Sequence, residues 1–440
     1  MTNSNTKFAE WVEEEIKSNS QHPFSEALFT QTQDRLAKSH YPTRKDEEWK
    51  YTPLASLLDS SPQRPEISAL DQTLIDELKS AMPDADTLIF VNGIYSETHS
   101  DSGTLTHTAD KHISLLGDLD EPSRQSVEAT IQNSKLTDEN IFEQVALGLS
   151  RYGLFIHLAK NVECQRPIHL IHISTGSEGT AFTNPIHVFH LEANSRLDVV
   201  EQYASQGSGA VVTVPATYVN VENGAKLQHF RIGSENANTK HISNTSVQVA
   251  QDGSYQSHQY LLGSELTRSN LEVEFTGKGS TAILRGVYLG DKGQHLDIRT
   301  YMDHAHAHCN SDQHFRGIMN GHSRGVFNGL VYVREHAQQT DARQSNKNLL
   351  LSRDARVDTK PQLEIFADDV KCTHGATVGE LDTNALFYLQ SRGIDKQEAA
   401  LMLTRAFAAE VTQEISLDSL QAYVQEKIAA SLDGIVAARV

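Results

Sequence analysis

The chain has 440 residues, and its 38 lysines and arginines are outnumbered by 57 aspartates and glutamates, which gives a net charge of −19 at pH 7. This acidic balance disfavours nucleic-acid binding, which needs a basic surface, and an anionic membrane surface would repel the chain. Three cysteines, Cys164, Cys309 and Cys372, are too few for a disulfide framework. No apolar run approaches the ~18 residues that span a bilayer, and the first residues lack a signal-peptide pattern, so we expect a cytoplasmic protein.

The N-terminal part of the chain is expected to form a mostly helical domain at residues 1–150. Its apolar residues recur at helical spacing in four segments, namely 8–16, 23–37, 67–81 and 140–152. A short strand is expected at 87–96, where Asn92-Gly93 is a strong signal for a tight turn.

From about Gly153 the pattern changes to short strands rich in β-branched and aromatic residues, separated by polar turns. The turns recur every 26 to 29 residues, at Asn194, Asn223, Asp252 and Lys278. A repeat of this length made only of strands is typical of a solenoid, and it predicts a mainly β chain with a right-handed parallel β-helix at residues 151–382. An antiparallel sandwich is the alternative, because it also alternates short strands and turns, although without a fixed long period.

A parallel β-helix leaves an open sheet edge at each end, where unpaired backbone groups invite another chain to pair. Flanking helices can cover such an edge, and a second solenoid can dock on it. Residues 383–440 are expected to form a C-terminal helical domain. Its final helix carries an apolar stripe from Leu417 to Ile435 with steps of three or four residues. This stripe packs either on the body of the same chain or on a partner.

Residues 361–393 combine a strand pattern with two candidate metal ligands. Cys372 and His374 are separated by one residue, so on a strand they share a face, with Cα atoms about 7 Å apart. A thiolate and an imidazole at this spacing can bind one metal, but two donors do not complete a tetrahedral site. Further ligands would have to come from elsewhere in the chain or from a partner. The alternative is a structural role, since a lone cysteine is often a small buried apolar residue.

Three runs carry a resemblance to a known family: PTRKDEEWKYTPL at 42–54, DARQSNKNLLLSRDARVDTKP at 341–361 and DDVKCTHGATVG at 368–379. They resemble the SufB/SufD family, the scaffold subunits of the SUF iron–sulfur cluster assembly complex, and the last run resembles the SufD branch in particular. The resemblance implies a parallel β-helix and a non-catalytic scaffold that pairs with SufB through the two solenoids. It also implies that the C-terminal helices dock SufC, the ABC-type ATPase of the complex. The expected contact residues are Leu386, Leu389, Leu403 and Phe407.

The resemblance also implies a role for the Cys-x-His pair. The matching histidine of the family faces SufB and contributes to building the cluster, which assigns His374, and after it Cys372, to a transient iron or iron–sulfur site at the interface. A reduced flavin bound by the complex is implied as well, with no site to assign in this sequence. When SufB is absent, a homodimer is the alternative assembly. The upstream cysteine of SufB has no counterpart in residues 344–353, and Gly375 follows His374 where SufB has a glutamate. We therefore expect that the chain does not assemble a cluster unaided.

A second group of candidate ligands is His304, His306 and His308, which alternate and would line one face of a strand with Cys309 on the other. The first and third Cα atoms of such a row lie about 13 Å apart, whereas donors to one zinc ion lie within about 4 Å of one another. The row is therefore predicted to be a polar ladder on the solenoid, and a loop conformation would reopen the question of a metal.

A function of another class is the alternative to a scaffold. A stand-alone β-helix enzyme could act on a polysaccharide or use a histidine-bound metal, and it would turn over substrate alone. The sequence contains no G-x-x-x-x-G-K-[ST] loop, so ATP binding by that route is excluded. A scaffold would be inert alone and would bind an ATPase subunit.

Overall fold

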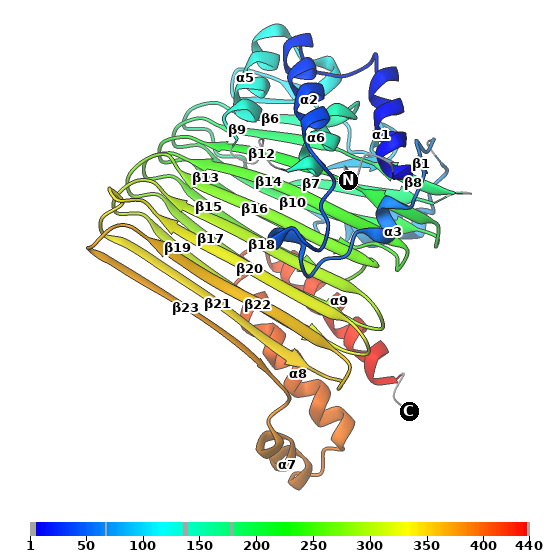
Figure 1. Ribbon diagram of the computed structural model, residues 1–440, viewed down its shortest axis with the longest axis vertical. Helices are drawn as coiled ribbons and strands as arrows, with labels where there is room; N and C mark the ends of the chain where they lie inside the picture. Colours follow the sequence, from blue (N-terminus) through cyan, green and yellow to red (C-terminus); the bar gives the residue numbers. More distant parts are fainter. Residues whose placement is uncertain (1–5, 67, 135–139, 177–178, 438–440) are drawn as a thin grey trace.

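The computed structural model describes residues 6–66, 68–134, 140–176 and 179–437. The chain forms an elongated β-solenoid with helices at both ends (Figure 1). Its strands belong to two sheets, one of 13 strands and one of 10, which we call sheet A and sheet B. From residue 153 onward, long strands alternate between the two sheets along the chain, and neighbouring strands within a sheet are parallel. This arrangement confirms the predicted mainly β solenoid and excludes the antiparallel sandwich.

The strands of the solenoid are 6 to 11 residues long. In sheet A they are β6 (Gly153–Leu158), β9 (Ile186–Leu191), β12 (Ala216–Val221), β14 (Thr239–Val249), β16 (Leu266–Phe275), β18 (His295–His304), β20 (Arg324–Val333) and β22 (Arg356–Ile365). In sheet B they are β7 (Ile168–Thr175), β10 (Arg196–Gln206), β13 (Lys226–Ser234), β15 (Ser254–Leu261), β17 (Thr281–Gly290), β19 (Asn310–Met319), β21 (Thr340–Leu350) and β23 (Val370–Gly379). Sheet A also includes three short strands outside its main row, namely β1 (Pro62–Gln63), β8 (Thr180–Thr183) and β11 (Ala210–Thr213).

The interior is filled by columns of apolar side chains that repeat from turn to turn. In sheet A, parallel pairing aligns Val219 with Val247, Val247 with Val273, and Val273 with Met302. All four side chains are buried in one core cluster. Burying a side chain of this size stabilises the fold by about 1.5–3 kcal/mol relative to exposure. Because neighbouring turns share each column, the solenoid is held together along its whole axis.

One corner of the solenoid repeats a left-handed backbone residue in each turn. Asn194, Gly224, Asp252, Gly279 and His308 all have φ between 56° and 73°. The backbone N–H of each donates to a carbonyl of the next turn, as from Asn194 to Asn223 at 2.9 Å. Asparagine, aspartate and glycine tolerate this conformation best, which explains the spacing of the turns in the sequence. At Gly224 a Cβ would lie 2.4 Å from Oδ1 of Asn194, so glycine is required there.

The N-terminal region supplies strands as well as helices. β2 (Asp86–Val91) pairs in parallel with β7 and extends sheet B, and it forms the predicted tight turn with β3 (Ile94–Tyr95). β5 (Lys111–Leu115) pairs with β6 and extends sheet A, followed by β4 (Thr106–His107). The sequence pattern indicated neither β4 nor β5, which are short and interrupted by polar residues.

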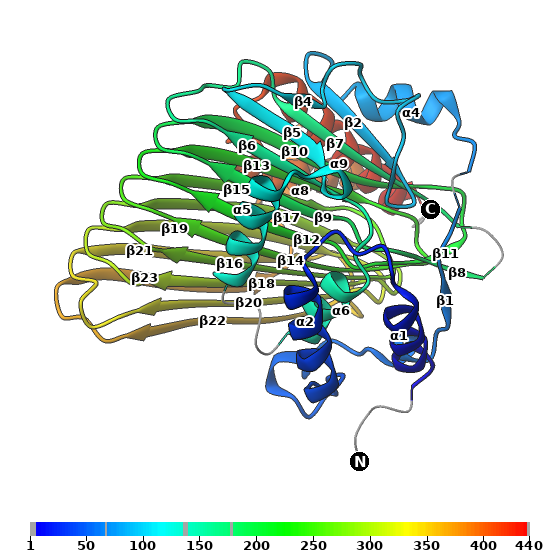
Figure 2. The ribbon, with the colours of Figure 1, turned by 90° about the horizontal axis from the view of Figure 1, so that it is seen from above.

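Most of the N-terminal helices lie on the walls at the N-terminal end of the solenoid, and one short helix, at residues 55–58, lies farther along the wall (Figure 1 and Figure 2). They are α1 (Lys7–Ser18), α2 (Glu26–Lys38), α3 (Ala55–Leu58), α4 (Gln72–Lys79), α5 (Glu121–Gln132) and α6 (Ile141–Gly148). Apolar residues of α1, α2 and α6 share one cluster with outward-facing residues of β9 and β12, whereas α4 packs against β2 and β7. The helices predicted at 8–16 and 23–37 are confirmed, whereas those predicted at 67–81 and 140–152 are shorter than predicted, and residue 67 lies outside the described residues. The sequence analysis missed α5.

The C-terminal helices are α7 (Thr383–Ser391), α8 (Lys396–Thr412) and α9 (Asp418–Ala437). The apolar stripe of α9 packs on the outer face of sheet B, where Leu420, Val424 and Ile428 join Phe230 and Tyr260 in one cluster. The stripe is therefore covered by the same chain and is not free for a partner. No helix within the described ranges is long and apolar enough to cross a membrane.

Candidate functional site

The C-terminal end of the solenoid is open. β22 pairs only with β20, and β23 only with β21, so each of these two 10-residue strands has a free edge (Figure 1). Residues of both strands are half-buried or exposed, unlike those of the strands before them. A free edge of this length presents a row of unpaired N–H and C=O groups. We call this end, bounded by β22 and β23, the mouth of the solenoid.

Cys372 and His374 both lie on β23, and their side chains turn toward the interior of the mouth. In the pairing of β21 with β23, Cys372 is aligned with Ala342 and His374 with Gln344. Cys372 is half-buried against the interior apolar cluster. His374 shares its face of the strand but is exposed, because no further turn covers it. The structure thus confirms that the two side chains share a strand face at an accessible end.

The two side chains differ in how ready they are to bind a metal. Burial raises the pKa of the Cys372 thiol, and the negative charge of Asp341 acts in the same direction. The thiol is therefore protonated near neutral pH, and it must lose a proton before it can act as a ligand. The imidazole of His374 needs no such step when it is neutral. Within the described ranges, no group of three or more His, Cys, Asp and Glu residues could hold a metal ion.

A polar column leads from the interior to His374. Gln313 is aligned with Gln344, and Gln344 with His374. Gln313 accepts a hydrogen bond of 2.7 Å from Thr300. By contrast, both polar atoms of the Gln344 amide are buried and make no hydrogen bond to any residue that the structure describes. Leaving such a group unpaired costs about 1–3 kcal/mol, so a polar group that enters the mouth would gain a ready partner.

A hydrogen-bonded network joins the two sheets next to this column. Asn346 accepts from Thr359 at 2.8 Å and from Asn348 at 2.6 Å, and it donates to the hydroxyl of Tyr288 at 3.1 Å. These residues come from both walls, on β21, β22 and β17. The network fixes the distance between the walls just inside the mouth, so the free edges are held on a rigid support.

Apolar side chains lie exposed along the free edges. Phe366 is 57% exposed, Val378 45% and Ile365 38%. Phe366 also ends an aromatic ladder on the outer face of sheet A, where ring centroids lie 5.3 Å apart between Phe366 and Tyr332. The sequence analysis missed these residues. The signal for these exposed residues lay in 361–379, where apolar residues occur on both faces of strands that no further turn covers.

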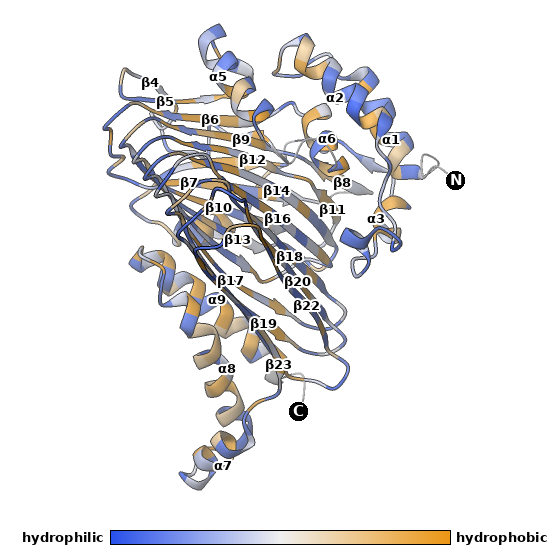
Figure 3. Cartoon of the chain, turned by 60° about the vertical axis from the view of Figure 1, so that its left-hand side comes forward, coloured by the Kyte–Doolittle hydropathy of each residue, from blue (hydrophilic) through white to orange (hydrophobic). Residues whose placement is uncertain are grey.

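The C-terminal helices expose a second apolar surface. α7 has no buried residue and projects away from the solenoid, as Figure 3 shows. The predicted contact residues Leu386 and Leu389 are half-buried there, whereas their neighbours Phe387 and Tyr388 are 72% and 58% exposed. The sequence analysis missed Phe387 and Tyr388. The run LFYL at 386–389 carried the signal, since it makes α7 apolar on more than one face.

The other two predicted contact residues lie nearer the solenoid. Leu403 and Phe407 of α8 line a groove of about 400 Å³ that also contains Val378 of β23. Phe407 packs against its own sheet, because the guanidinium of Arg316 lies 4.9 Å from the centre of its ring. Met402, on the same helix, is 44% exposed. The groove joins the surface of α8 to the free edge of β23.

The predicted histidine ladder is wrong. β18 ends at His304, which is buried and lies 2.8 Å from the hydroxyl of Ser311. His306 and His308 are exposed in the corner that follows, and His308 is its left-handed residue. Cys309 is buried in the apolar core. The three imidazoles share no strand face, because the alternation of a strand stops where the corner begins.

A second polar cluster lies inside the first turns of the solenoid, and the sequence analysis missed it. The carboxylate of Glu201 accepts from His229 at 3.1 Å, from Arg231 at 3.0 Å and from Tyr203 at 3.0 Å. Burial by itself would raise the pKa of Glu201, but Arg231 and His229 hold it well below its usual range. The signal lay in the polar residues that alternate with apolar ones in β10 and β13.

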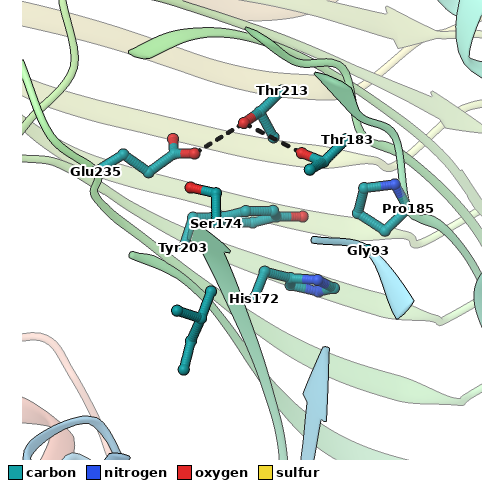
Figure 4. A pocket seen from close by; sticks show the side chains of 9 residues that line it. Gly93, His172, Ser174, Thr183, Pro185, Tyr203, Thr213 and Glu235 are labelled. Carbon is teal, nitrogen blue, oxygen red and sulfur yellow. Dashed lines mark hydrogen bonds between the residues drawn. The ribbon is translucent and has the colours of Figure 1, made fainter. Parts of the chain in front are cut away.

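A small cavity adjoins this cluster (Figure 4). It has a volume of about 10 Å³ and is lined by His172, Tyr203 and Glu235, among others. That volume is enough for a single water molecule. Thr213 donates to Glu235 at 2.9 Å across the same space. The cavity lies near β7 and β10, many turns from the mouth, so it is not part of the Cys372 and His374 site.

Comparison with known proteins relates this chain to one family. The family described as "SUF system FeS cluster assembly, SufBD core domain" matches residues 172–407. The iron–sulfur cluster assembly protein SufD of Escherichia coli (strain K12) is 34% identical over 411 residues, which cover 91% of each chain. An iron–sulfur cluster assembly SufBD family protein of Synechocystis sp. is 26% identical over 89% of this chain and 88% of its own length. SufD of Bacillus subtilis (strain 168) is 25% identical over 64% of this chain and 65% of its own length. With a family match over more than half of its length, the chain belongs to the SufBD family and is a SufD-like protein of iron–sulfur cluster assembly.

Proposed function

We propose that this chain is a non-catalytic scaffold subunit that pairs with SufB through β22 and β23 and docks the ATPase SufC through α7 and α8. The observation that carries the proposal is the pair of free 10-residue strand edges at one end of the solenoid. Long exposed edges are normally protected in a protein that acts alone. Here they lie beside exposed Phe366 and Val378, so a partner that adds strands would cover backbone and apolar groups together.

In this proposal the mouth becomes the place of cluster assembly. His374 and Cys372 supply two donors, and SufB supplies the remaining ligands to the iron or the nascent cluster, which is the cargo. Pairing also brings a polar partner within reach of the Gln344 amide, which has none among the described residues. Iron binding by Cys372 would release a proton, because burial raises the pKa of the thiol.

The attachment of α8 suggests how SufC would act on the mouth. Arg316 of β19 pairs with Glu410 of α8, and Arg285 of β17 binds Glu414, in the turn that follows α8, at 2.6 Å. A displacement of α8 is therefore transmitted directly to sheet B, whose last strand carries His374. We propose that SufC dimerises when it binds ATP, strains the joint with SufB and exposes the face that bears His374.

The reduced flavin that the resemblance implies is not assigned to this chain. A groove of about 880 Å³ lies between residues 38–49 and the outer face of sheet A. Its two buried arginines are already paired, Arg268 with Asp297 at 3.0 Å and Arg299 with Glu48. The groove therefore lacks free buried cations for the phosphate of a flavin nucleotide. No step of the proposal involves a flavin.

Co-purification with SufB and SufC under reducing conditions tests the proposal with two reciprocal variants. Phe366→Asp places a charge beside the free edge of β22, away from the groove of α8, and is expected to abolish binding of SufB while SufC is retained. Phe387→Asp on α7 is expected to abolish binding of SufC while SufB is retained. Each variant is thus the control for the other. If the wild-type chain binds neither protein, or turns over a substrate alone, the scaffold function is wrong.

A further inference from the structure

A polar pocket lies at the opposite end of the solenoid from the mouth. It has a volume of about 60 Å³ and is lined by Arg64, Arg151, Tyr152, Phe182 and Asn184, among others. Arg64 follows β1, Arg151 precedes β6, and the other wall comes from the β8 region and the β2–β3 hairpin. The pocket therefore depends on the fold of the complete N-terminal region.

The pocket has an excess of positive charge. Two guanidinium groups face one carboxylate, since Arg64 lies 3.1 Å and Arg151 lies 3.7 Å from Oε2 of Glu15. Burial lowers the pKa of Arg64, and the nearby charge of Arg151 opposes the stabilising effect of Glu15. Glu15 neutralises only one of the two positive charges, so an anion bound on the pocket side of the guanidinium groups would neutralise the other. The excess is notable in a chain whose net charge is −19.

The two arginines differ in how their donors are used. Arg64 donates to Glu15, to Asn184 at 3.0 Å and to the carbonyl of Leu149 at 2.6 Å. The Nε of Arg151 is buried and makes no hydrogen bond to any residue within the described ranges. A buried guanidinium N–H without an acceptor is costly, and an oxygen atom in the pocket would satisfy it.

The size of the cavity fits a ligand larger than one water molecule. A water needs about 10–15 Å³ of such volume, so 60 Å³ accommodates several waters or one small anion. Guanidinium groups bind sulfate, phosphate and carboxylate oxygens in a bidentate manner. We propose that this pocket binds a small oxyanion between Arg64 and Arg151, at a site distinct from the mouth.

The site also adjoins the interior of the solenoid. Gly93 and Thr183 line both this pocket and the 10 Å³ cavity beside His172 and Tyr203 (Figure 4). A bound anion would thus lie at the entrance to the buried polar cluster. Because Glu15 of α1 pairs with both arginines, the bound anion would also link α1 to the first turns of the solenoid.

Thermal unfolding of the full chain in sodium sulfate, sodium phosphate and sodium acetate tests the site, with sodium chloride at equal ionic strength as the reference. At least one oxyanion is expected to raise Tm in a saturable manner beyond chloride, and titration calorimetry then gives its Kd. Arg151→Gln is expected to weaken that Kd roughly ten- to hundredfold, as for loss of a charge-assisted hydrogen bond.

Arg196→Gln is the matched control, because Arg196 is an exposed arginine that pairs with Glu163. This variant is expected to keep the wild-type Kd. Arg151→Lys keeps the charge but loses the bidentate geometry of the guanidinium group. If Arg151→Gln does not fold, Arg151→Lys is expected to bind the oxyanion with intermediate affinity. No oxyanion effect beyond chloride in the wild type, or an equal effect in the Arg151 and Arg196 variants, would overturn the proposal.

Discussion

The two ends of the solenoid differ in whether their sheet edges are covered. At the N-terminal end, β2 and β5 add strands to both sheets, and α1, α2 and α6 cover the outside. At the C-terminal end, β22 and β23 have no neighbour on their outer edges, and apolar side chains beside these edges remain exposed. The same repeat is thus completed by its own chain at one end and left with unpaired strand edges at the other.

Polar groups in the interior also differ between the two ends. Near the closed end, Glu201 is paired with Arg231, His229 and Tyr203. Near the mouth, the Gln344 amide is buried without a partner among the described residues, and His374 is exposed. We infer that the closed end carries stability and the open end carries function. Four experiments separate these contributions.

Replacement of Glu201 by Ala is expected to have the largest effect on stability. It would leave Arg231 and His229 buried without their carboxylate, which costs about 3–5 kcal/mol in the free energy of unfolding. Denaturation with urea measures the loss. Glu163→Ala removes a glutamate that pairs with Arg196 on the surface, 3.7 Å away, and is expected to change stability little. Equal losses in the two variants would refute a stabilising role for the closed end.

Acidification is expected to destabilise the closed end through its buried histidines. Burial lowers the pKa of His169 and of His187 to about 4. Below the unfolded-state pKa of about 6.5, the unfolded chain binds protons that the native chain does not, so stability falls as the pH drops from 6.5 toward 4. At pH 5 the cost is about 2 kcal/mol for each such histidine.

Urea denaturation at pH 7 and pH 5 measures this dependence. His169→Gln is expected to reduce the difference between the two pH values, whereas His322→Gln, at a histidine that is 78% exposed, is expected to preserve it. A wild-type stability that does not decrease between pH 7 and pH 5 would contradict the assignment of neutral buried histidines.

A pair of glycines tests how tightly the region just inside the mouth is packed. A Cβ at Gly329 would lie 2.2 Å from Nε2 of Gln344 and 3.0 Å from Oγ1 of Thr300. Gly329→Ala would therefore overpack this site. Overpacking of this kind costs about 1–3 kcal/mol in the free energy of unfolding, and we expect about 1 kcal/mol, because the Gln344 amide has no hydrogen bond to break. At Gly375 a Cβ would meet no atom within 4 Å, so Gly375→Ala is the control. Equal stabilities of the two variants would show that Gln344 moves aside freely.

The sequence repeat made the solenoid predictable. The positions of some of its corners could not be predicted from the sequence. Asn194 and Asp252 mark left-handed corners because their side chains tolerate that backbone, so the period was visible in the sequence. His308 occupies the same kind of corner without the expected residue type. The alternation of His304, His306 and His308 therefore predicts a continuous strand, whereas β18 ends at His304. Neighbouring turns impose the corner at this position, and local propensity does not reveal it.

The candidate site was likewise only partly predictable from the sequence. The shared strand face of Cys372 and His374 follows from spacing alone and is confirmed. The position of their strand at the end of a stack depends on where the repeat stops, which the abrupt change to helix at α7 indicated. The Glu201 cluster and the Arg64–Arg151 pocket were not predictable. Each unites residues from several turns or from distant segments, and only the fold determines which of them meet.

His374→Ala is expected to have the smallest effect on stability and a large effect on function. His374 is exposed on the last strand, so its removal should change the free energy of unfolding by no more than about 0.5 kcal/mol. Co-purification with SufB and SufC should persist, while the yield of iron–sulfur cluster, followed by absorbance, should fall severalfold. His322→Ala, which removes another exposed histidine outside the mouth, should leave the yield unchanged. A wild-type yield in His374→Ala would remove this imidazole from the assembly site, and the free edges would then serve pairing alone.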